Sequence, residues 1–273
     1  MSAEIKLAVR SSGKALKHDR MGNGPLEVFR HHPSLSRGLQ SHEPCQGEDI
    51  VGLLRLQPGS SVLDIACGKA EMPVRLAETY EVRGVGVDLS PYAVRDAEEL
   101  KRQRVPDSDL QFVNISGADY HNGNTKQFDL SMCIGASWIY DGHRGTLKAM
   151  RDMTKPDGIV MVGEPFFTQE PSEKYLAAED FTRDDFNTHY GNVQIGEEEG
   201  LTPIYAMVSN QDDWDRYETL QWHAVDDFAR HNPDDPDLPE IQARGAKARE
   251  IYLKWGRYGF GWAIYLFRKP VKI

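Results

Sequence analysis

Short apolar runs alternate with amphipathic stretches between residues 60 and 164, and this alternation limits the fold more than any other feature of the chain. The runs rich in β-branched residues predict strands, and the amphipathic stretches predict helices. Strands and helices that alternate at this spacing form βαβ units, which build a parallel sheet with helices on both faces. The expected strands are 62–66, 82–88, 110–114, 128–134 and 159–163, and the expected helices are 70–80, 91–104 and 144–154.

The last third of the chain predicts two further strands, at 201–209 and 261–267, with helices at 214–231 and 238–255 between them. The predicted fold is therefore a doubly wound, seven-stranded α/β sheet with a helical insertion between its last two strands. We divide the chain into the following parts: a mobile basic arm at 1–25, an N-terminal helical lid at 26–57, a core at 58–210 and 258–273, and a helical cap at 211–257.

Charge and hydropathy exclude several classes of function. With 42 acidic and 32 basic residues the net charge is -10, which disfavours binding to the phosphate backbone of nucleic acids. The apolar stretches Gly158–Phe167 and Gly259–Phe267 are shorter than the roughly 18 residues that span a membrane, so no membrane helix is expected. Cys45, Cys67 and Cys133 show no CxxC spacing, which predicts neither a disulfide framework nor a metal site and favours a reducing cytoplasm.

Residues 60–90 are the most informative segment for function. A buried strand reaches Asp64, the chain passes Ala66 and Gly68, and a helix follows; the next strand ends at Asp88. Ligands of doubly wound folds bind at the carboxyl ends of the strands, where small residues let a ligand approach the backbone. A carboxylate at the end of the second strand can accept two hydrogen bonds from a ribose diol, so the segment predicts a nucleoside site.

The turn chemistry separates two kinds of nucleoside ligand. A dinucleotide site needs the pattern G-x-G-x-x-G, because its glycines let a pyrophosphate lie on the turn. Here the three positions are Gly68, Ala70 and Pro73, and the proline has no amide hydrogen to donate. The sequence therefore disfavours a pyrophosphate cradle.

The segment Asp64–Glu71 resembles the first motif of class I S-adenosylmethionine-dependent methyltransferases, an acidic residue followed by G-x-G, with Ala66 in place of the first glycine. Other motifs of the family follow in order, namely Gly117–Asp119, Phe128–Leu130 and Lys155–Gly158. The resemblance covers about residues 58–164 and implies a Rossmann-like fold that binds S-adenosyl-L-methionine. The cofactor contacts that it implies are Asp64, Ala66, Gly68, Asp88 (ribose hydroxyls), Leu89 (adenine ring), Asp119 (adenine amino group) and Cys133.

The sequence says less about the residues that bind the methyl acceptor. Family members that methylate planar amide or base nitrogens carry an Asp/Asn-Pro-Pro-aromatic motif after the fourth strand, where this chain has Ile134–Trp138, so such acceptors are disfavoured. Candidate catalytic residues are His42, His143 and Glu164, each with the alternative of an ordinary structural hydrogen bond or salt bridge. Candidate substrate contacts are Trp138, Tyr140, Phe166, Trp214, Tyr217 and Trp222. Tyr217 lies on the apolar stripe of its helix, so packing on the sheet is its alternative, whereas Trp214 and Trp222 lie off that stripe, where one of them can face the acceptor.

These observations predict a cytoplasmic methyltransferase that transfers a methyl group to an O, N, S or C nucleophile of a small molecule by in-line displacement. Two alternatives stay open: an enzyme that binds the cofactor without transferring methyl, and a partner-binding protein that has lost the activity. A homodimer is compatible with either. The segment from Glu197 to Glu240 holds thirteen acidic and two basic residues, so the acidity is concentrated in and beside the predicted cap.

Overall fold

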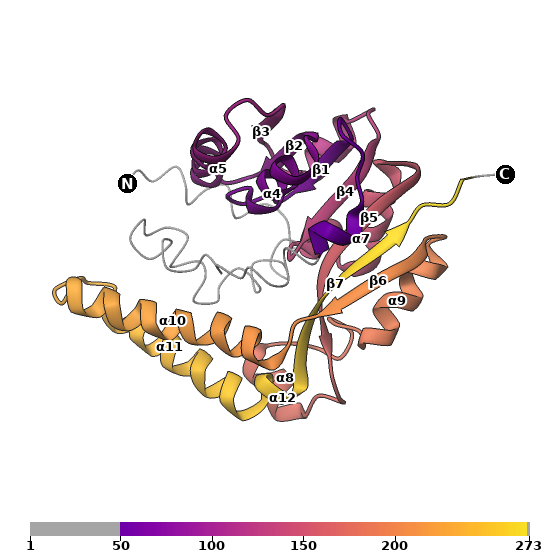
Figure 1. Cartoon of the computed structure of the whole chain (residues 1–273). Helices are drawn as coiled ribbons and strands as arrows, with labels where there is room; N and C mark the ends of the chain where they lie inside the picture. The colour runs from indigo at the N-terminus through magenta and orange to yellow at the C-terminus, as the bar shows by residue number, and fades with distance from the viewer. Residues whose placement is uncertain (1–49, 272–273) are drawn as a thin grey trace. The chain divides into compact units, whose positions relative to one another are not determined.

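The fold is built around one mixed β-sheet. A computed structural model describes residues 50–271 of the chain, and within them seven strands lie in the order β3-β2-β1-β4-β5-β7-β6 (Figure 1). The strands are β1 (Ser61–Ile65), β2 (Arg83–Asp88), β3 (Leu110–Asn114), β4 (Phe128–Ile134), β5 (Thr154–Phe167), β6 (Thr202–Val208) and β7 (Phe260–Arg268). This order confirms the predicted doubly wound, seven-stranded α/β fold.

The strands that alternate with helices pair in parallel, as predicted, but the complete sheet is mixed. Strands β1 to β5 pair in parallel, whereas β7 inserts between β5 and β6 and pairs antiparallel with both. The βαβ pattern that enforces parallel pairing ends at β5, and β6 and β7 are joined by the long helical insertion. Because β1, β2, β4 and β5 run in parallel, their carboxyl ends lie at one edge of the sheet.

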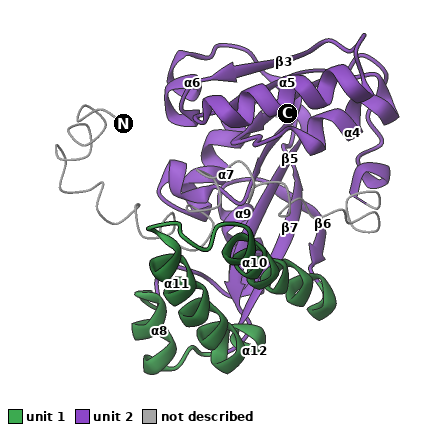
Figure 2. Cartoon of the chain, turned by 90° about the vertical axis from the view of Figure 1, so that its left-hand side faces the viewer, with its two compact units in different colours: residues 1–42, 170–183, 210–259 green, residues 43–169, 184–209, 260–273 purple. Residues whose placement is uncertain are grey.

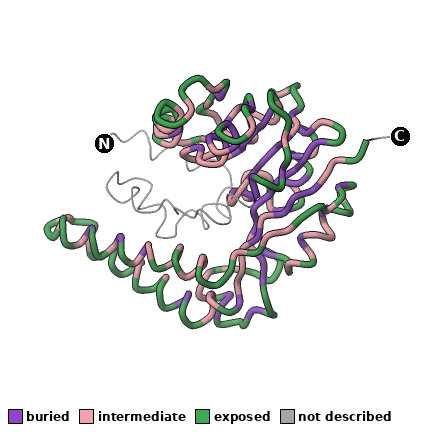
Figure 3. The backbone as a smooth tube through the Cα atoms, in the orientation of Figure 1, coloured by how far each residue is buried: buried purple, intermediate pink, exposed green. Residues whose placement is uncertain are grey.

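Helices cover both faces of the sheet. They are α4 (Glu71–Tyr80), α5 (Pro91–Arg104), α6 (Gly117–Gly123), α7 (His143–Asp152), α9 (His189–Glu198) and the short 3-10 helix η3 (Ser137–Tyr140). Val74 and Leu76 of α4 pack with Met132 in one core, while Leu147 and Met150 of α7 belong to a second core. Buried positions accordingly concentrate along the strands (Figure 3).

Most predicted strands and helices agree with the structure within two residues, but β5 is much longer than expected. The strand was predicted at 159–163 after a turn at Lys155–Gly158, whereas β5 already begins at Thr154. The expected turn is a bulge inside the strand, where Asp157 has φ 64° and its N–H donates to the Lys269 carbonyl at 2.8 Å. The backbone therefore keeps its sheet partner while it takes up the extra residues.

Three helices were not predicted: α6, α8 (Glu173–Glu179) and α9. Helices α6 and α8 have seven residues each, too few to show two turns of apolar periodicity. Helix α9 contains Gly191 and Gly196, both of which lower helix propensity. These helices begin at side-chain caps, from Ser116, Ser172 and Thr188, which the sequence analysis did not use.

The described residues fall into two compact units (Figure 2). Among the described residues, the larger unit contains the sheet and consists of 50–169, 184–209 and 260–271. Among the described residues, the smaller unit consists of 170–183 and 210–259, with α8, α10 (Gln211–His231), α11 (Leu238–Ile251), the π-helical turn η4 (Tyr252–Gly256) and α12 (Arg257–Gly259). The predicted helices between the last two strands are thus present.

The smaller unit has a small apolar core of its own and hydrogen bonds between its helices. Ala224 and Phe228 of α10 pack against Ile241 of α11. Asp215 accepts hydrogen bonds from the Arg257 guanidinium, with the shorter at 2.8 Å. These contacts hold α10 to the end of the insertion, so the two long helices form a helical hairpin.

None of the helices within residues 50–271 is both long and apolar enough to cross a membrane.

Helix α9 packs so closely on β7 that a methyl group cannot be added at Gly196. An ideal Cβ at Gly196 would lie 2.1 Å from the Phe267 ring, and Phe267 is fully buried. We expect Gly196→Ala to lower the free energy of unfolding by about 1–3 kcal/mol, measured by urea denaturation. The matched control is Gly52→Ala at an exposed helical position with no atom within 4 Å of the new Cβ, and it should be neutral or stabilising. Equal stability of the two variants would contradict this packing.

Candidate functional site

The turn after β1 has an unusual backbone that leaves space beside it. Ala66, Gly68 and Ala70 all have positive φ, at 59°, 54° and 65°. For alanine this conformation is strained, and such strain is typical of functional turns. A Cβ placed on Gly68 would meet no atom within 4 Å, so the backbone there is open to an approaching group. The structure thus brings the predicted small residues together at the carboxyl end of β1.

The carboxylate of Asp88 holds this turn to the end of β2. One oxygen accepts a hydrogen bond from the Gly68 N–H at 2.9 Å, and the other accepts one from the Ser90 N–H at 2.8 Å. Each carboxylate oxygen can accept a second hydrogen bond. Asp88 is half-buried, so two further hydroxyl donors can reach it from the open side.

Asp64 lies beneath the same turn, inside the protein. Its side chain points from a fully buried strand, and burial, followed by the nearby Asp88 carboxylate, raises the pKa of Asp64 to about 8. Within residues 50–271 no Lys or Arg forms an ion pair with Asp64. A cation bound next to it would therefore be strongly favoured, because it would let the buried carboxylate ionise.

The two described cysteines are protonated and unlinked. Both Cys67 and Cys133 are free thiols, and Cys133 pairs in register with Ile65 of β1. Burial, followed by the Asp64 carboxylate, raises the pKa of both thiols well above the usual range. Such thiols are poor nucleophiles, so packing explains them better than redox chemistry.

The predicted adenine contacts lie in different surroundings. Leu89 is 72 % exposed beside Asp88, which leaves an apolar surface that a flat ring can cover. Asp119 is exposed in the first turn of α6, where its carboxylate accepts a hydrogen bond from the Ser116 hydroxyl at 2.6 Å. Asp119 thus stabilises the N-terminus of α6, and its contact with adenine stays a prediction.

Three predicted substrate contacts lie near the carboxyl ends of β4 and β5. Trp138 and Tyr140 belong to η3, and the Tyr140 hydroxyl donates to the Gly117 carbonyl at 2.9 Å. Phe166 is buried near the end of β5, with its ring 5.1 Å from that of His189. Of these three side chains, Phe166 is part of the core and Trp138 is half-buried.

The structure brings two of the predicted catalytic residues together. His143 is the first residue of α7, Glu164 lies near the end of β5, and His143 Nδ1 is 4.0 Å from Glu164 Oε2. The other imidazole nitrogen bonds to the Asn192 carbonyl at 3.0 Å, and the Ser137 hydroxyl donates to Glu164 Oε1 at 3.1 Å. Burial lowers the pKa of His143 to about 4 and raises the pKa of Glu164 to about 7.

Sequence reasoning missed the polar residues that surround this pair. Asn192 of α9 donates to the Tyr265 hydroxyl at 3.2 Å, and that hydroxyl lies 2.9 Å from His189 Nδ1. Asn192 and Tyr265 are fully buried. A polar residue inside an apolar strand such as β7 was the available signal for Tyr265, but nothing in the sequence indicated its partners.

The remaining candidates lie elsewhere. His42 is outside the described residues. Trp214 and Tyr217 stack in α10 with ring centroids 5.7 Å apart, and Trp222 lies 6.4 Å from Tyr252. These three residues belong to the smaller unit, and their substrate roles stay predictions.

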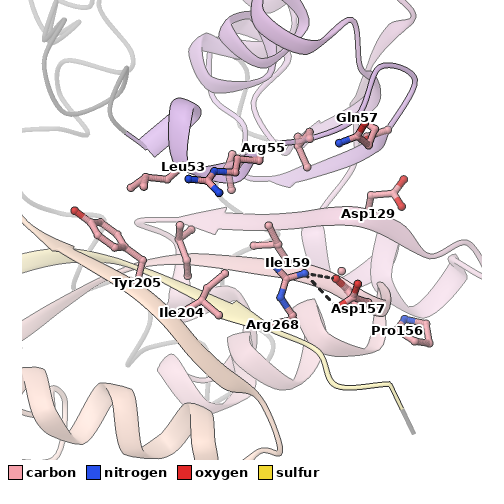
Figure 4. A pocket seen from close by; sticks show the side chains of 15 residues that line it. Leu53, Arg55, Gln57, Asp129, Pro156, Asp157, Ile159, Ile204, Tyr205 and Arg268 are labelled. Atoms are coloured by element: carbon pink, nitrogen blue, oxygen red, sulfur yellow. Dashed lines mark hydrogen bonds and ion pairs between the residues drawn. The ribbon is translucent and has the colours of Figure 1, made fainter. Parts of the chain in front are cut away.

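Among the described residues, no group of three or more His, Cys, Asp or Glu side chains is arranged to hold a metal ion. A cavity of about 520 Å³ lies at the opposite edge of the sheet, near the amino ends of the strands (Figure 4). Leu53, Ile204 and Tyr205 line it, and Arg268 in its wall bonds to Asp157. None of the predicted site residues lines this cavity.

The sheet order and the open turn at Gly68 define a Rossmann-like nucleoside-binding domain. Residues 62–158 match the family model of the methyltransferase domain. The chain is 28% identical over 229 residues to the uncharacterized protein YjhP of Escherichia coli K12, covering 82% of this chain and 92% of that protein. It is 26% identical to the trans-aconitate 2-methyltransferase of Deinococcus radiodurans, over 63% of each chain.

A solved structure with the same fold carries a ligand. The S-adenosylmethionine-dependent methyltransferase of Geobacter sulfurreducens, in complex with S-adenosyl-L-homocysteine, superposes with a TM-score of 0.76 at 25% identity. The alignment covers 86% of this chain and 98% of that one. Residues 62–158 are thus a methyltransferase domain, and the fold is that of the class I S-adenosylmethionine-dependent methyltransferases.

The raised pKa of Asp64 has a consequence for stability. The folded state keeps a proton on Asp64 up to about pH 8, while the unfolded state loses it near pH 4, so this group lowers stability as pH rises between these values. Relative to Asp64→Asn, we expect the wild-type free energy of unfolding to fall by up to about 1.4 kcal/mol per pH unit. Urea denaturation from pH 5 to 8 measures this difference.

The exposed Asp107→Asn serves as the control, and it should not alter the pH dependence. If wild type and Asp64→Asn show parallel pH profiles, Asp64 is ionised in the folded protein and its assigned environment is wrong.

Proposed function

We propose that this protein transfers the methyl group of S-adenosyl-L-methionine to a small organic acceptor. The observation that carries the proposal is the open, left-handed turn at Gly68, tied by its N–H to the Asp88 carboxylate. This combination gives a nucleoside both a backbone surface to lie on and an acceptor for its ribose diol.

The residues at this edge fit the cofactor. Asp88 would hold the ribose hydroxyls, Leu89 would cover the adenine, and Asp64 would face the ammonium of the methionine part. Ala66 and Gly68 leave the backbone approachable. When bound, the cofactor supplies a methyl carbon on a positively charged sulfur, which is a good leaving group.

The protein must then orient the acceptor behind this carbon and keep water away, and positioning alone can supply several kcal/mol. We place the acceptor near the carboxyl ends of β4 and β5, beside Trp138, Tyr140 and Phe166. A small-molecule acceptor is supported by the D. radiodurans relative, which is named for trans-aconitate. The surplus of acidic over basic residues supports the absence of nucleic acid from the substrates.

Cofactor binding tests the role of Asp88. We expect Asp88→Ala to weaken binding of S-adenosyl-L-homocysteine about 10–100-fold by isothermal titration calorimetry, because a charge-assisted hydrogen bond to each hydroxyl is lost. Glu98→Gln, at an exposed position of the neighbouring helix α5, is the control and should bind normally. A thermal melt of each variant separates loss of binding from loss of fold. Unchanged affinity of Asp88→Ala would contradict the assignment.

Methyl transfer itself can be followed without knowing the acceptor. We expect protein incubated with methyl-labelled S-adenosyl-L-methionine and a whole-cell extract to move label into the small-molecule fraction, resolved by mass spectrometry. The Asp88→Ala variant is the matched negative control. Label only in protein or nucleic acid would contradict a small acceptor, and release of no label would contradict transfer.

A further inference from the structure

The pair formed by Glu164 and His143 contains two buried polar atoms that lack hydrogen-bond partners within residues 50–271. These atoms are Glu164 Oε2 and His143 Nδ1, and they face each other at 4.0 Å. Both side chains are at least 96 % buried. A buried polar atom without a partner costs roughly 1–3 kcal/mol, so an arrangement that satisfies both atoms at once is strongly favoured.

The hydrogen bond on the far side of the imidazole fixes its tautomer. His143 Nε2 lies 3.0 Å from the Asn192 carbonyl oxygen, which can only accept, so Nε2 carries the ring proton. Burial lowers the pKa of His143 to about 4, so the ring is neutral and Nδ1 can only accept. The missing partner of Nδ1 must therefore be a donor.

Glu164 can become this donor by taking up one proton. The Ser137 hydroxyl already donates to Oε1, which leaves Oε2 as the oxygen without a partner. A proton on Oε2 would be donated to His143 Nδ1 after a side-chain movement of about 1 Å, since N···O distances in hydrogen bonds are about 2.7–3.2 Å. One proton thus satisfies both atoms and leaves the pair uncharged.

We propose that Glu164 and His143 hold one exchangeable proton between them, and that Glu164, once that proton has left, accepts the proton of the methyl acceptor through the hydroxyl of Ser137. This inference rests on the proposed methyl transfer and names its acceptor class: a neutral molecule whose nucleophile carries a removable proton, as in a hydroxyl or amine. His143 is a positioning residue that orients Glu164.

In the proposed methyl transfer, the acceptor proton moves to the Ser137 oxygen while the Ser137 hydroxyl proton moves to Glu164 Oε1. The lone pair left on the acceptor forms the bond to the methyl carbon, and the electron pair of the broken carbon–sulfur bond stays on sulfur. The products are the methylated acceptor, S-adenosylhomocysteine and protonated Glu164.

The position of the pair agrees with this role. Ser137 lies three residues after the end of β4, and Glu164 follows Gly163, which pairs with the last residue of that strand. Both therefore lie at the edge of the sheet that carries Asp64 and the open turn. A carboxylate acceptor brings no proton and would be repelled by ionised Glu164, so the pair disfavours it.

Other ionisable groups face the pair without competing for the proton. Burial keeps the Cys133 thiol and the Tyr265 hydroxyl protonated by raising the pKa of both groups. Arg144 lies beside His143 and disfavours a second proton on the ring. The remaining neighbours, Asp64 beyond Cys133 and His189 beyond Tyr265, do not bond to either member of the pair in the described residues.

Spectroscopy of the full chain with S-adenosyl-L-homocysteine tests the shared proton without any acceptor. Between pH 5.5 and 8.5 we expect an infrared C=O band of a protonated carboxyl that disappears as pH rises, is absent in Glu164→Gln, and persists in the exposed control Glu98→Gln. The ammonium of the bound ligand favours ionised Asp64, and the difference between wild type and Glu164→Gln cancels any band that Asp64 retains. Nitrogen-15 NMR should show His143 neutral, with its proton on Nε2, throughout.

Each outcome decides a different point. A carboxyl band that Glu164→Gln leaves unchanged, or a doubly protonated His143, overturns the shared proton. Calorimetry on the same samples separates the two proposals. If wild type fails to bind S-adenosyl-L-homocysteine, the proposed function fails; if it binds while Glu164 shows no proton, only this inference fails.

The acceptor identified by label tracing tests the second part of the proposal, namely that Glu164 accepts the proton of the acceptor through Ser137. We expect a hydroxyl or amine product, a kcat that rises with pH through about 7, and a kcat about 100-fold or more lower in Glu164→Gln with unchanged affinity for S-adenosyl-L-homocysteine. Ser137→Ala should lower kcat likewise but keep the infrared band. A product methylated on a carboxylate, or a flat pH profile, overturns the role of Glu164 as proton acceptor.

Discussion

The functional edge of the sheet depends on the two hydrogen bonds that the Asp88 carboxylate accepts, from the N–H groups of Gly68 and Ser90. They tie a strained turn after β1 to the start of the helix after β2. Ala66 and Ala70 can stay in the left-handed region only because the surrounding structure holds them there. We assign the same carboxylate to the ribose hydroxyls, so in our proposal one residue both stabilises the turn and binds the ligand.

A second constraint is that no Lys or Arg among residues 50–271 pairs with the buried acids at this edge. Asp64 and Glu164 stand on β1 and β5, with Cys133 on β4 between those strands, and no Lys or Arg in residues 50–271 forms an ion pair with either acid. Both acids therefore favour the protonated form. A cationic ligand or a loss of protons must accompany their ionisation, which makes this edge suited to a positively charged sulfur and to proton acceptance.

The sequence predicted the fold well where local patterns are strong and less well where contacts over long distances decide. Strands β3 and β4 and helix α5 were predicted to their ends, because their flanking turns and apolar patterns are unambiguous. The bulge at Asp157 could not be predicted, since its partner Lys269 lies 112 residues away. Likewise His143 and Glu164 could each be assigned to an edge of the sheet, but their mutual approach depends on Asn192 of α9, a helix that was not predicted.

The location of the acidic charge matters more than its sum. Many carboxylates between Glu197 and Glu240 are neutralised within their own unit: Glu199 bonds to Arg144, Asp215 to Arg257, and Asp226 to Arg230. These ion pairs lie within a helix or link neighbouring elements. Exposed pairs of this kind change the local electrostatic potential little. Asp64 and Glu164, which are buried at the carboxyl edge, form no ion pair with a Lys or Arg of residues 50–271. In our proposals Asp64 faces the cofactor and Glu164 the acceptor, so the charge that the ligands meet is set by these two residues outside the acid-rich segment and not by the net charge of -10.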